Sequence, residues 1–283
     1  MNDPHPFLKW AGGKTKLLPE LLARVPATFK TYHEPFLGGG ALFFALPTTK
    51  AVLSDLNPTL VRTYIAVRDE VEEVIRLLRN HARAHEKYGL NHYLAVRAIC
   101  TDLASDMACA ARMIYLNKTC FNGLWRVNKS GQFNVPMGKF KTPPTICDEE
   151  NLHACSRRLC GAEIYCKGFK QLPLNVRRDD FVYFDPPYVP LSKMSDSDQR
   201  SFTSYTKEGF GPKDQAALAE VVRQLDAQGT RFLLSNAGSP VVKELYDGFK
   251  IEEVLMRRNI NSKVGSRGSV VEYLISSLGK RLP

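Results

Sequence analysis

The chain has 283 residues, of which 44% are hydrophobic and 24% charged, a globular composition that excludes fibres and disordered tails. No apolar stretch reaches the roughly 18 residues of a membrane span, and Lys9, Lys14 and Lys16 interrupt any apolar block of a signal peptide. Seven cysteines without a Cys-x-x-Cys pair argue against a disulfide framework or a structural zinc. We therefore expect a cytoplasmic monomer with reduced thiols, no metal and no membrane contact.

Apolar periodicity and turn residues predict alternating helices and strands in the first part of the chain. The expected order is a helix over residues 15–25, a strand over 31–35, a helix over 41–46 and a strand over 51–54. Pro58 fits the first turn of a further helix. This order is typical of the front of a doubly wound sheet.

The middle of the chain is helical, with helices expected over residues 69–84, 91–103 and 106–116. Loop and hairpin material rich in Gly, Asn and Pro follows over 117–144. Further on, strands are expected over 163–166, 181–184, 231–235, 251–256 and 270–276, with a helix over 213–225. The prediction is an α/β protein. Residues 1–57 and 159–283 form a Rossmann-like doubly wound sheet, interrupted by an inserted helical and loop domain of residues 58–158.

The positive charge is unevenly distributed, because the surplus of 39 basic over 29 acidic side chains lies in two segments without acids. Residues 107–147 contain Arg112, Lys118, Arg126, Lys129, Lys139 and Lys141, and residues 254–271 contain Arg257, Arg258, Lys263 and Arg267. Solvated loops and a polyanion-binding surface would both show this pattern. The first segment favours a nucleic acid, because aromatic and amide side chains that can stack on bases and bond to them alternate with its charges. They are Tyr115, Phe121, Trp125, Phe133 and Phe140, and Asn117, Asn122, Asn128 and Asn134.

A carboxylate directly follows an apolar strand where residues 181–184 lead into Asp185-Pro186-Pro187-Tyr188. Open α/β sheets hold their ligands at this end of their strands. The prolines stiffen the turn, so Asp185 and the carbonyl of Pro186 can accept both hydrogens of an amino group beside the ring of Tyr188. Such acceptors suit the exocyclic amine of a planar base and make its nitrogen more nucleophilic. A proline-capped strand end without a catalytic role is the alternative.

Two other segments suit a nucleotide-like ligand. Glu34-Pro-Phe-Leu-Gly-Gly-Gly40 permits close approach of the backbone, and Asp55, at the end of the next strand, is placed to accept ribose hydroxyls. A tight turn without a ligand is the alternative for this pair. Trp10-Ala-Gly-Gly-Lys14-Thr15 is not a phosphate loop, because Leu8 replaces the first glycine of that motif. Its Gly-Gly turn beside Lys14 can still bind a carboxylate.

Together these motifs resemble those of the Dam-type N6-adenine DNA methyltransferases of the D12 class. The matching segments, in that family's order, are Lys9-Trp-Ala-Gly-Gly-Lys14, Glu34-Pro-Phe-Leu-Gly-Gly-Gly40, Ser54-Asp-Leu-Asn57, Asn122-Gly-Leu-Trp-Arg-Val-Asn128, Phe133-Asn-Val-Pro-Met-Gly138, Asp185-Pro-Pro-Tyr188 and Arg257-Arg-Asn-Ile-Asn-Ser262. The resemblance covers nearly the whole chain. It implies a methyltransferase sheet and methyl transfer from S-adenosylmethionine to adenine N6 in double-stranded DNA, with S-adenosylhomocysteine as product.

The resemblance also implies roles for individual residues. The cofactor would be bound by Trp10, Lys14, Asp55 and Asp185 and lined by Phe36, Gly38 and Phe169, while Asp185, Pro186 and Tyr188 would act on an adenine flipped out of the duplex. DNA would be bound by Lys9, Phe121, Asn122, Leu124, Arg126, Asn128, Asn134, Pro136, Lys139 and Phe140. Among these, Phe121 and Asn122 match positions that enter the base stack, and Leu124, Arg126 and Pro136 match positions that read GATC in the major groove. Phosphate contacts are expected mainly from Lys118, Lys129, Lys139, Lys141 and Asn134.

The sequence departs from the family pattern at Phe121 and Phe140, where tyrosine is more usual, and at Trp125, which is bulkier than expected. Two other functions are compatible with part of the pattern. An RNA methyltransferase can use Asp-Pro-Pro-Tyr on guanine amines, but it leaves residues 122–138 unexplained. A DNA-binding module without activity would not bind S-adenosylmethionine. A partner restriction nuclease cannot be identified from the sequence.

Overall fold

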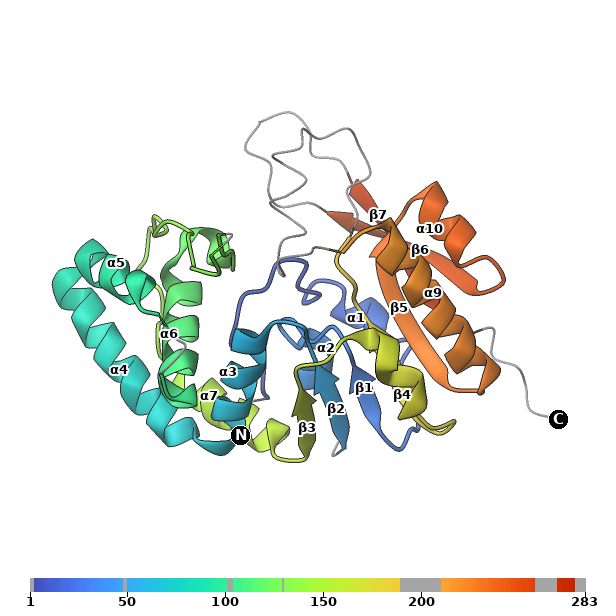
Figure 1. The fold of residues 1–283 in the computed structure, drawn as a ribbon, viewed down its shortest axis with the longest axis horizontal. Coiled ribbons are helices and arrows are strands. Elements are labelled where there is room, and N and C mark those ends of the chain that lie inside the picture. Colours follow the sequence, from blue (N-terminus) through green and yellow to red (C-terminus); the bar gives the residue numbers. More distant parts are fainter. Residues whose placement is uncertain are drawn as a thin grey trace.

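The computed structural model describes residues 3–47, 50–100, 104–128, 130–188, 210–257 and 269–277. Its centre is a seven-stranded sheet with a helical region beside it (Figure 1). In chain order the strands are β1 Tyr32–Glu34, β2 Ala51–Ser54, β3 Ala162–Tyr165, β4 Phe181–Phe184, β5 Arg231–Ala237, β6 Lys250–Arg257 and β7 Ser269–Ser276. Their order across the sheet is β3-β2-β1-β4-β5-β7-β6.

The sheet has a topological switch point between β1 and β4. From β1 the chain continues outward to β2 and β3 on one side, and from β4 it continues to β5 on the other. These five strands pair in parallel, whereas β7 pairs antiparallel with both β5 and β6. The fold is therefore the expected α/β, Rossmann-like sheet. Its ligand crevice is expected at the carboxyl ends of β1 and β4.

Helices lie on both sides of the sheet and form the neighbouring insert. They are α1 Leu18–Leu22, α2 Ala41–Ala45, α3 Pro58–Asp69, α4 Val71–Tyr88, α5 Leu90–Ala98, α6 Asp106–Thr119, α7 Glu149–Leu159, α9 Pro212–Ala227 and α10 Pro240–Leu245, with 3-10 turns η1 Phe121–Gly123 and η2 Phe169–Leu174. Local sequence explains their starts. Asn57 accepts the backbone N–H of Leu60 at 3.1 Å ahead of Pro58, and Ser105 and Asp148 cap α6 and α7 in the same way.

Two hydrophobic clusters cover the two faces of the sheet. In β4 the side chains alternate, so that Phe181 and Tyr183 join one cluster and Val182 and Phe184 the other. The second cluster packs against α9 and α10. The first continues from the sheet into α3, α4 and α6, where it includes Leu78. The insert at the left of Figure 1 therefore shares its core with the sheet.

The described elements differ from the expected ones at three places. The helix expected over residues 15–25 spans only Leu18–Leu22, because Pro19 can occupy only the first turn of a helix. Helices α7 and α10 were not predicted, although acids begin α7 and Arg157 and Arg158 end it. In the described part of residues 117–144, the expected hairpin consists of two isolated bridges, Cys120 to Met137 and Val127 to Phe133. No helix of the described ranges has the length and apolarity to cross a bilayer.

Candidate active site

A cavity of about 250 Å³ opens at the switch point of the sheet. The segments that follow β1, β2, β3 and β4 all reach it, together with the loop around residues 10–14. The residues predicted for the cofactor and for catalysis all line it: Trp10, Lys14, Phe36, Gly38, Asp55, Phe169, Asp185, Pro186 and Tyr188. The structure thus brings together predicted residues from Trp10 to Tyr188 that lie far apart in the chain.

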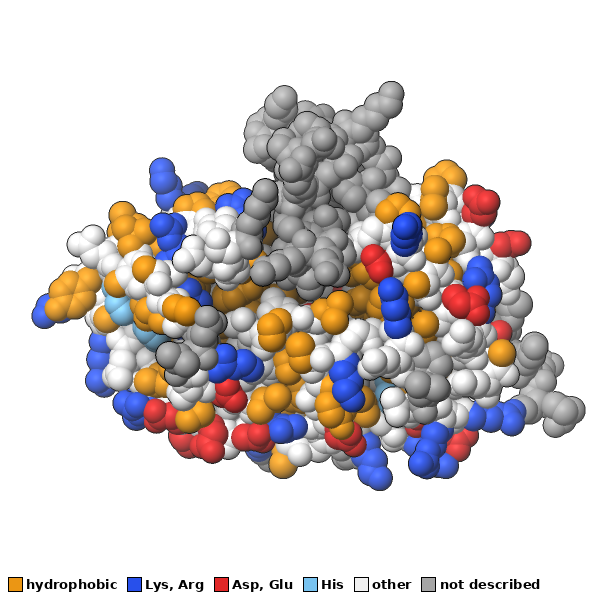
Figure 2. Space-filling model, in the orientation of Figure 1, with side chains coloured by type: hydrophobic (Ala, Val, Ile, Leu, Met, Phe, Trp, Pro, Cys, Tyr) orange, Lys and Arg blue, Asp and Glu red, His pale blue; other side chains and the backbone are white. Residues whose placement is uncertain are grey.

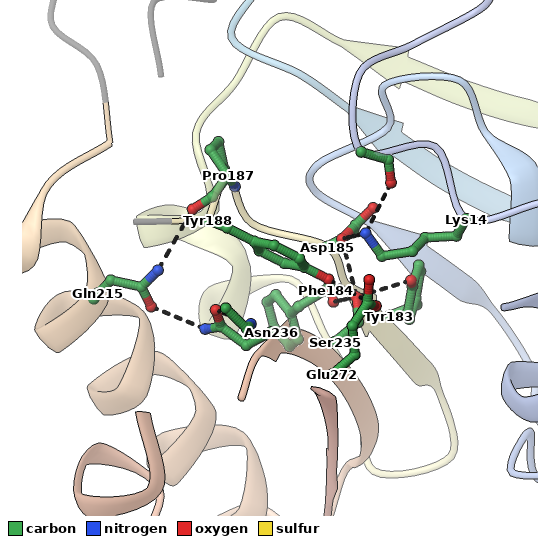
Figure 3. Close-up of polar contacts among 12 residues, drawn as sticks. Lys14, Tyr183, Phe184, Asp185, Pro187, Tyr188, Gln215, Ser235, Asn236 and Glu272 are labelled. Atoms are coloured by element: carbon green, nitrogen blue, oxygen red, sulfur yellow. Dashed lines mark hydrogen bonds and ion pairs between the residues drawn. The ribbon is translucent and has the colours of Figure 1, made fainter. Parts of the chain in front are cut away.

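Asp185 is the centre of the polar contacts in this cavity (Figure 3). Its Oδ1 lies 2.8 Å from Nζ of Lys14 and 2.9 Å from Oγ of Ser235. Burial raises the pKa of Asp185, while the charge of Lys14 and the hydrogen bonds from Lys14 and Ser235 act in the opposite direction. Burial alone would lower the pKa of Lys14, but Asp185 and the other acidic neighbours outweigh it, so that this pKa is raised. The site holds an ammonium and a carboxylate as an ion pair.

The Asp-Pro-Pro-Tyr turn is also held from the neighbouring strands. Nε2 of Gln215 donates to the carbonyl of Pro187 at 3.5 Å, and Nδ2 of Asn236 donates to Oε1 of Gln215 at 3.1 Å. The phenol of Tyr188 donates to Oε2 of Glu272 at 3.0 Å. Figure 3 shows these side chains gathered around the turn from α9, β5 and β7. Catalytic groups need such support, because a small misplacement is costly to the reaction.

The other half of the cavity is built on glycine and a half-buried carboxylate. Asp55 accepts the backbone N–H of Gly38 at 3.1 Å and that of Asn57 at 2.9 Å. Burial raises the pKa of Asp55, and these backbone donors oppose the shift. Gly38 has a φ of +46°, and a Cβ there would lie 2.7 Å from the indole of Trp10. Only glycine therefore permits this turn.

Aromatic rings form the wall beside this carboxylate. The rings of Phe36 and Phe169 stack with centroids 5.4 Å apart, and Phe210 meets Phe36 edge-on at 5.8 Å. Phe210 was missed from the sequence, because it lies in a segment without periodicity and only the fold brings it here. Ser235, Gln215, Asn236 and Glu272 were also missed, although three of them lie within predicted strands or helices. They are ordinary polar residues, and their sequence context carries no motif.

Apart from Lys9, which lies in the N-terminal segment, the predicted DNA-binding residues lie in the loops that follow α6. The side chains of Phe121 and Phe140 are 50% and 41% exposed, which is unusual for phenylalanine and leaves their rings available to a partner. Asn122 has a φ of +55°, a conformation that asparagine tolerates better than most residues. Lys9, Asn134, Pro136 and Lys139 are exposed, and Leu124, Arg126 and Asn128 are half-buried. Figure 2 shows basic side chains along the upper edge of the insert, at the left of the view.

Two internal contacts order this surface. The buried amide of Asn117 binds both backbone groups of Lys9, at 2.8 and 2.7 Å, and the carbonyl of Gly123 at 2.9 Å. It thereby joins the N-terminal segment to the loop that carries Asn122. Nε of Arg126 donates to Oδ1 of Asn134 at 2.8 Å.

Part of the sequence-based interpretation of this segment is corrected by burial. Tyr115, Asn117, Trp125 and Phe133 are core residues rather than surface groups that could stack on bases. Arg112 is also buried, because its guanidinium donates to the carbonyls of Val96 and Arg97 at the end of α5. The side chain of Asn128 closes a turn by accepting the backbone N–H groups of Ser130 and Gln132. Lys129, Arg258, Lys263 and Arg267 lie outside the described residues, as does the side chain of Arg257.

A family model for D12 class N6 adenine-specific DNA methyltransferases matches residues 10–260. The chain belongs to this family. It is 41% identical over 281 residues to the type II methyltransferase M1.LlaDCHI of Lactococcus lactis subsp. cremoris, which covers 97% of this chain and 96% of that protein. It is 40% identical over 291 residues to the type II methyltransferase M.MjaIII of Methanocaldococcus jannaschii, over 96% and 99% of the two chains.

More distant relatives carry the name DNA adenine methylase. The protein of that name from Salmonella typhi is 31% identical over 274 residues, covering 97% of this chain and 95% of the relative. The methyltransferase described here is accordingly an enzyme of the adenine-specific DNA class, and DNA is its substrate. The family assignment expected from the motifs is confirmed.

Proposed function

We propose that this methyltransferase transfers a methyl group from S-adenosylmethionine to N6 of an adenine flipped out of duplex DNA, within GATC. The observation that carries the proposal is the position of Asp185, which lies as one partner of an ion pair in the same cavity as the glycine turn and Asp55. Asp185, which can accept an amine, therefore lies next to the glycine turn and Asp55, which can hold a nucleoside. Members of the family need both.

The residues of the cavity fit S-adenosylmethionine. The Gly38 turn lets the indole of Trp10 pack closely against the backbone beside Asp55, the rings of Phe36 and Phe169 offer an apolar wall to a purine, and Asp55 offers oxygens to ribose hydroxyls. The ammonium of Lys14 suits the carboxylate of the methionine part. When bound, the cofactor supplies an electrophilic methyl group. It is a proposal that Trp10, Lys14, Phe36, Gly38, Asp55, Phe169 and Asp185 form its site.

The protein's own contribution to the reaction is to orient and activate the amine. Asp185 and the carbonyl of Pro186 would accept the two N–H groups of adenine, which shifts the nitrogen lone pair toward the methyl donor. The ring of Tyr188, fixed through Glu272, would stack on the base. Adenine cannot reach this cavity from within a duplex, so the base has to be flipped out.

Recognition is assigned to the insert, residues 58–158. Phe121 and Asn122 would enter the space that the flipped base leaves, and the rings of Trp125 and Phe133 pack together in the same loops. Nε of Arg126 donates a hydrogen bond to Asn134. The two terminal nitrogens of the guanidinium can then donate to O6 and N7 of a guanine. The remaining predicted contacts, Lys9, Leu124, Asn128, Pro136, Lys139 and Phe140, complete the proposed DNA surface.

The test is to express the enzyme in a host that lacks adenine methylases and to sequence its DNA for N6-methyladenine. The proposal requires modification within GATC and none in cells that carry the Asp185→Ala variant. Purified enzyme should methylate duplex oligonucleotides only when S-adenosylmethionine is present. Preferential methylation of RNA would establish the RNA methyltransferase instead, and modification of another DNA sequence would overturn the GATC assignment while leaving the chemistry intact.

A further inference from the structure

Ser235 lies directly behind the catalytic carboxylate, although no sequence motif marks it. It is on β5, which pairs in parallel with β4 so that Leu234 is opposite Phe184. The next residue on each strand is Ser235 on β5 and Asp185 after β4, and these two therefore meet at the carboxyl edge of the sheet. The side chain of Ser235 is completely buried.

The hydroxyl of Ser235 makes three hydrogen-bond contacts at short distance and also interacts with the phenol of Tyr188. Its Oγ is 2.9 Å from Oδ1 of Asp185, 3.0 Å from the phenol oxygen of Tyr183 and 3.4 Å from the carbonyl of Phe184. The shortest of these contacts has a carboxylate as its acceptor, and a charged acceptor makes the stronger hydrogen bond. Ser235 therefore donates its single hydroxyl hydrogen to Asp185. Tyr183, whose pKa burial raises well above its ordinary value, keeps its proton and can donate to Ser235.

Lys14 and Ser235 both contact the same oxygen of Asp185, Oδ1. A carboxylate held by two donors on one oxygen cannot rotate without losing both. The ammonium of Lys14 approaches from the loop around residues 10–14, and the hydroxyl of Ser235 approaches from β5 (Figure 3). Among the contacts of the described residues, none reaches the other oxygen, Oδ2, and this oxygen is available for a substrate.

We propose that Ser235 is a positioning residue of the methyl transfer, which together with Tyr183 fixes Asp185 so that Oδ2 meets the N6 amine of the adenine. This inference rests on the proposed function and deepens it. Ser235 touches neither adenine nor cofactor in this arrangement and acts through Asp185. Its hydroxyl keeps the carboxylate oriented and ionised while the amine binds.

The experiment compares the wild-type enzyme with Ser235→Ala on a duplex oligonucleotide. We expect kcat to fall roughly 10- to 100-fold in the variant, the range typical of a lost hydrogen bond to a charged group, while KM for DNA and the binding of S-adenosylmethionine change little. A donor that favours the ionised form is lost, so the acid limb of the kcat profile should move to higher pH. The titratable groups around Asp185 that stay in place are Lys14, Tyr32, Glu34, Tyr183, Tyr188 and Glu272.

Two conservative variants separate positioning from packing. Ser235→Thr keeps the hydroxyl and should restore most of kcat and the wild-type pH profile. Tyr183→Phe removes only the donor behind Ser235 and should give a smaller fall in kcat and a smaller pH shift in the same direction. Thr230→Val is the matched control. It deletes a buried hydroxyl just before the amino end of the same strand, where Thr230 contacts the carbonyl of Arg177 at 3.3 Å, and it should leave the pH profile unchanged.

The outcomes of this experiment distinguish the inference from the proposed function. If the wild-type enzyme forms no N6-methyladenine, the proposed function fails. If the wild-type enzyme is active and Ser235→Ala retains its kcat and pH profile, the role of Ser235 is refuted. The same holds if Ser235→Ala and Thr230→Val lose activity equally and only in proportion to their melting temperatures, because the loss would then be structural.

Discussion

The carboxyl edge of the sheet and the loops that follow α6 both combine charged and aromatic residues, but they differ in how firmly these residues are held and how far they are exposed. At the sheet edge, Asp185 and Lys14 are fixed by contacts from several elements, and the groups around them are buried. In the loops after α6, Phe121 and Phe140 are exposed while Trp125 and Phe133 are buried. Chemistry needs groups fixed before the substrate arrives, whereas recognition needs side chains presented on a firm support.

The two regions also differ in the interactions that stabilise their backbones. Strand pairing fixes the catalytic turn on both sides of β4. In the loops after α6, the described residues have only two isolated bridges and contacts such as that of Asn117 with Lys9. Stability there depends on a few buried side chains. Substitutions at the sheet edge should therefore reduce turnover, whereas substitutions in the loops after α6 should reduce DNA binding.

The largest effect is expected from Asp185→Ala, which removes the amine acceptor and leaves the loops after α6 unchanged. Turnover should fall by at least about 10³-fold, since an interaction made at the reacting atom is lost, while the Kd for duplex DNA stays within a few-fold. Single-turnover methylation and fluorescence anisotropy measure the two quantities. Asp179→Ala, an exposed aspartate before the opposite end of β4, is the control. A variant with substantial turnover would remove Asp185 from its proposed role.

Trp125→Ala should break the recognition region while sparing the sheet. The ring of Trp125 is buried against Phe133 at 4.9 Å, and its truncation should lower the free energy of unfolding by about 3–4 kcal/mol. We expect DNA binding to be lost and S-adenosylmethionine binding to persist, as measured by urea unfolding and calorimetry. Phe140→Ala, at an exposed ring, should cost less than about 0.5 kcal/mol of stability. Equal loss of cofactor binding would show that the two regions do not act separately.

Arg126→Ala should separate recognition from affinity. Loss of a bidentate contact to guanine would reduce discrimination at one base pair by about 1–3 kcal/mol. The measurement is kcat/KM on GATC and on duplexes with a single substitution. Arg79→Ala, at an exposed arginine paired with Glu149 on the insert, should leave discrimination unchanged. A uniform loss across all sequences would instead make Arg126 a phosphate contact.

The smallest effect concerns pH, and it should arise in the insert rather than at the sheet. Burial lowers the pKa of His81 from 6.5 to about 4. Between these values the unfolded chain binds the proton and the folded chain does not, so the stabilising contribution is present above pH 6.5 and is lost as the pH falls toward 4. Because solvent reaches part of the ring, we expect a loss of only roughly 1–2 kcal/mol. Urea unfolding at pH 7 and 5 should show a weaker pH dependence for His81→Phe.

The sequence by itself determined the class of fold, the family and the residues of the cavity. Each depends on local patterns: an apolar strand ending in Asp185, a glycine turn with a carboxylate at the next strand end, and motifs in a recognisable order. Such patterns can be read from the sequence alone, because the period of a strand and the conformational freedom of glycine depend only on residues that are neighbours in the chain.

Only the tertiary structure decided which residues support these groups. Ser235, Gln215 and Glu272 reach the catalytic turn through strand pairing and helix packing, and no local pattern records such contacts. The structure also separated the aromatic residues after α6 into exposed and buried ones, since amino-acid type alone does not fix burial. Alternation of charges and rings therefore marked out the segment that we propose for recognition, while packing assigned its members to the surface or the core.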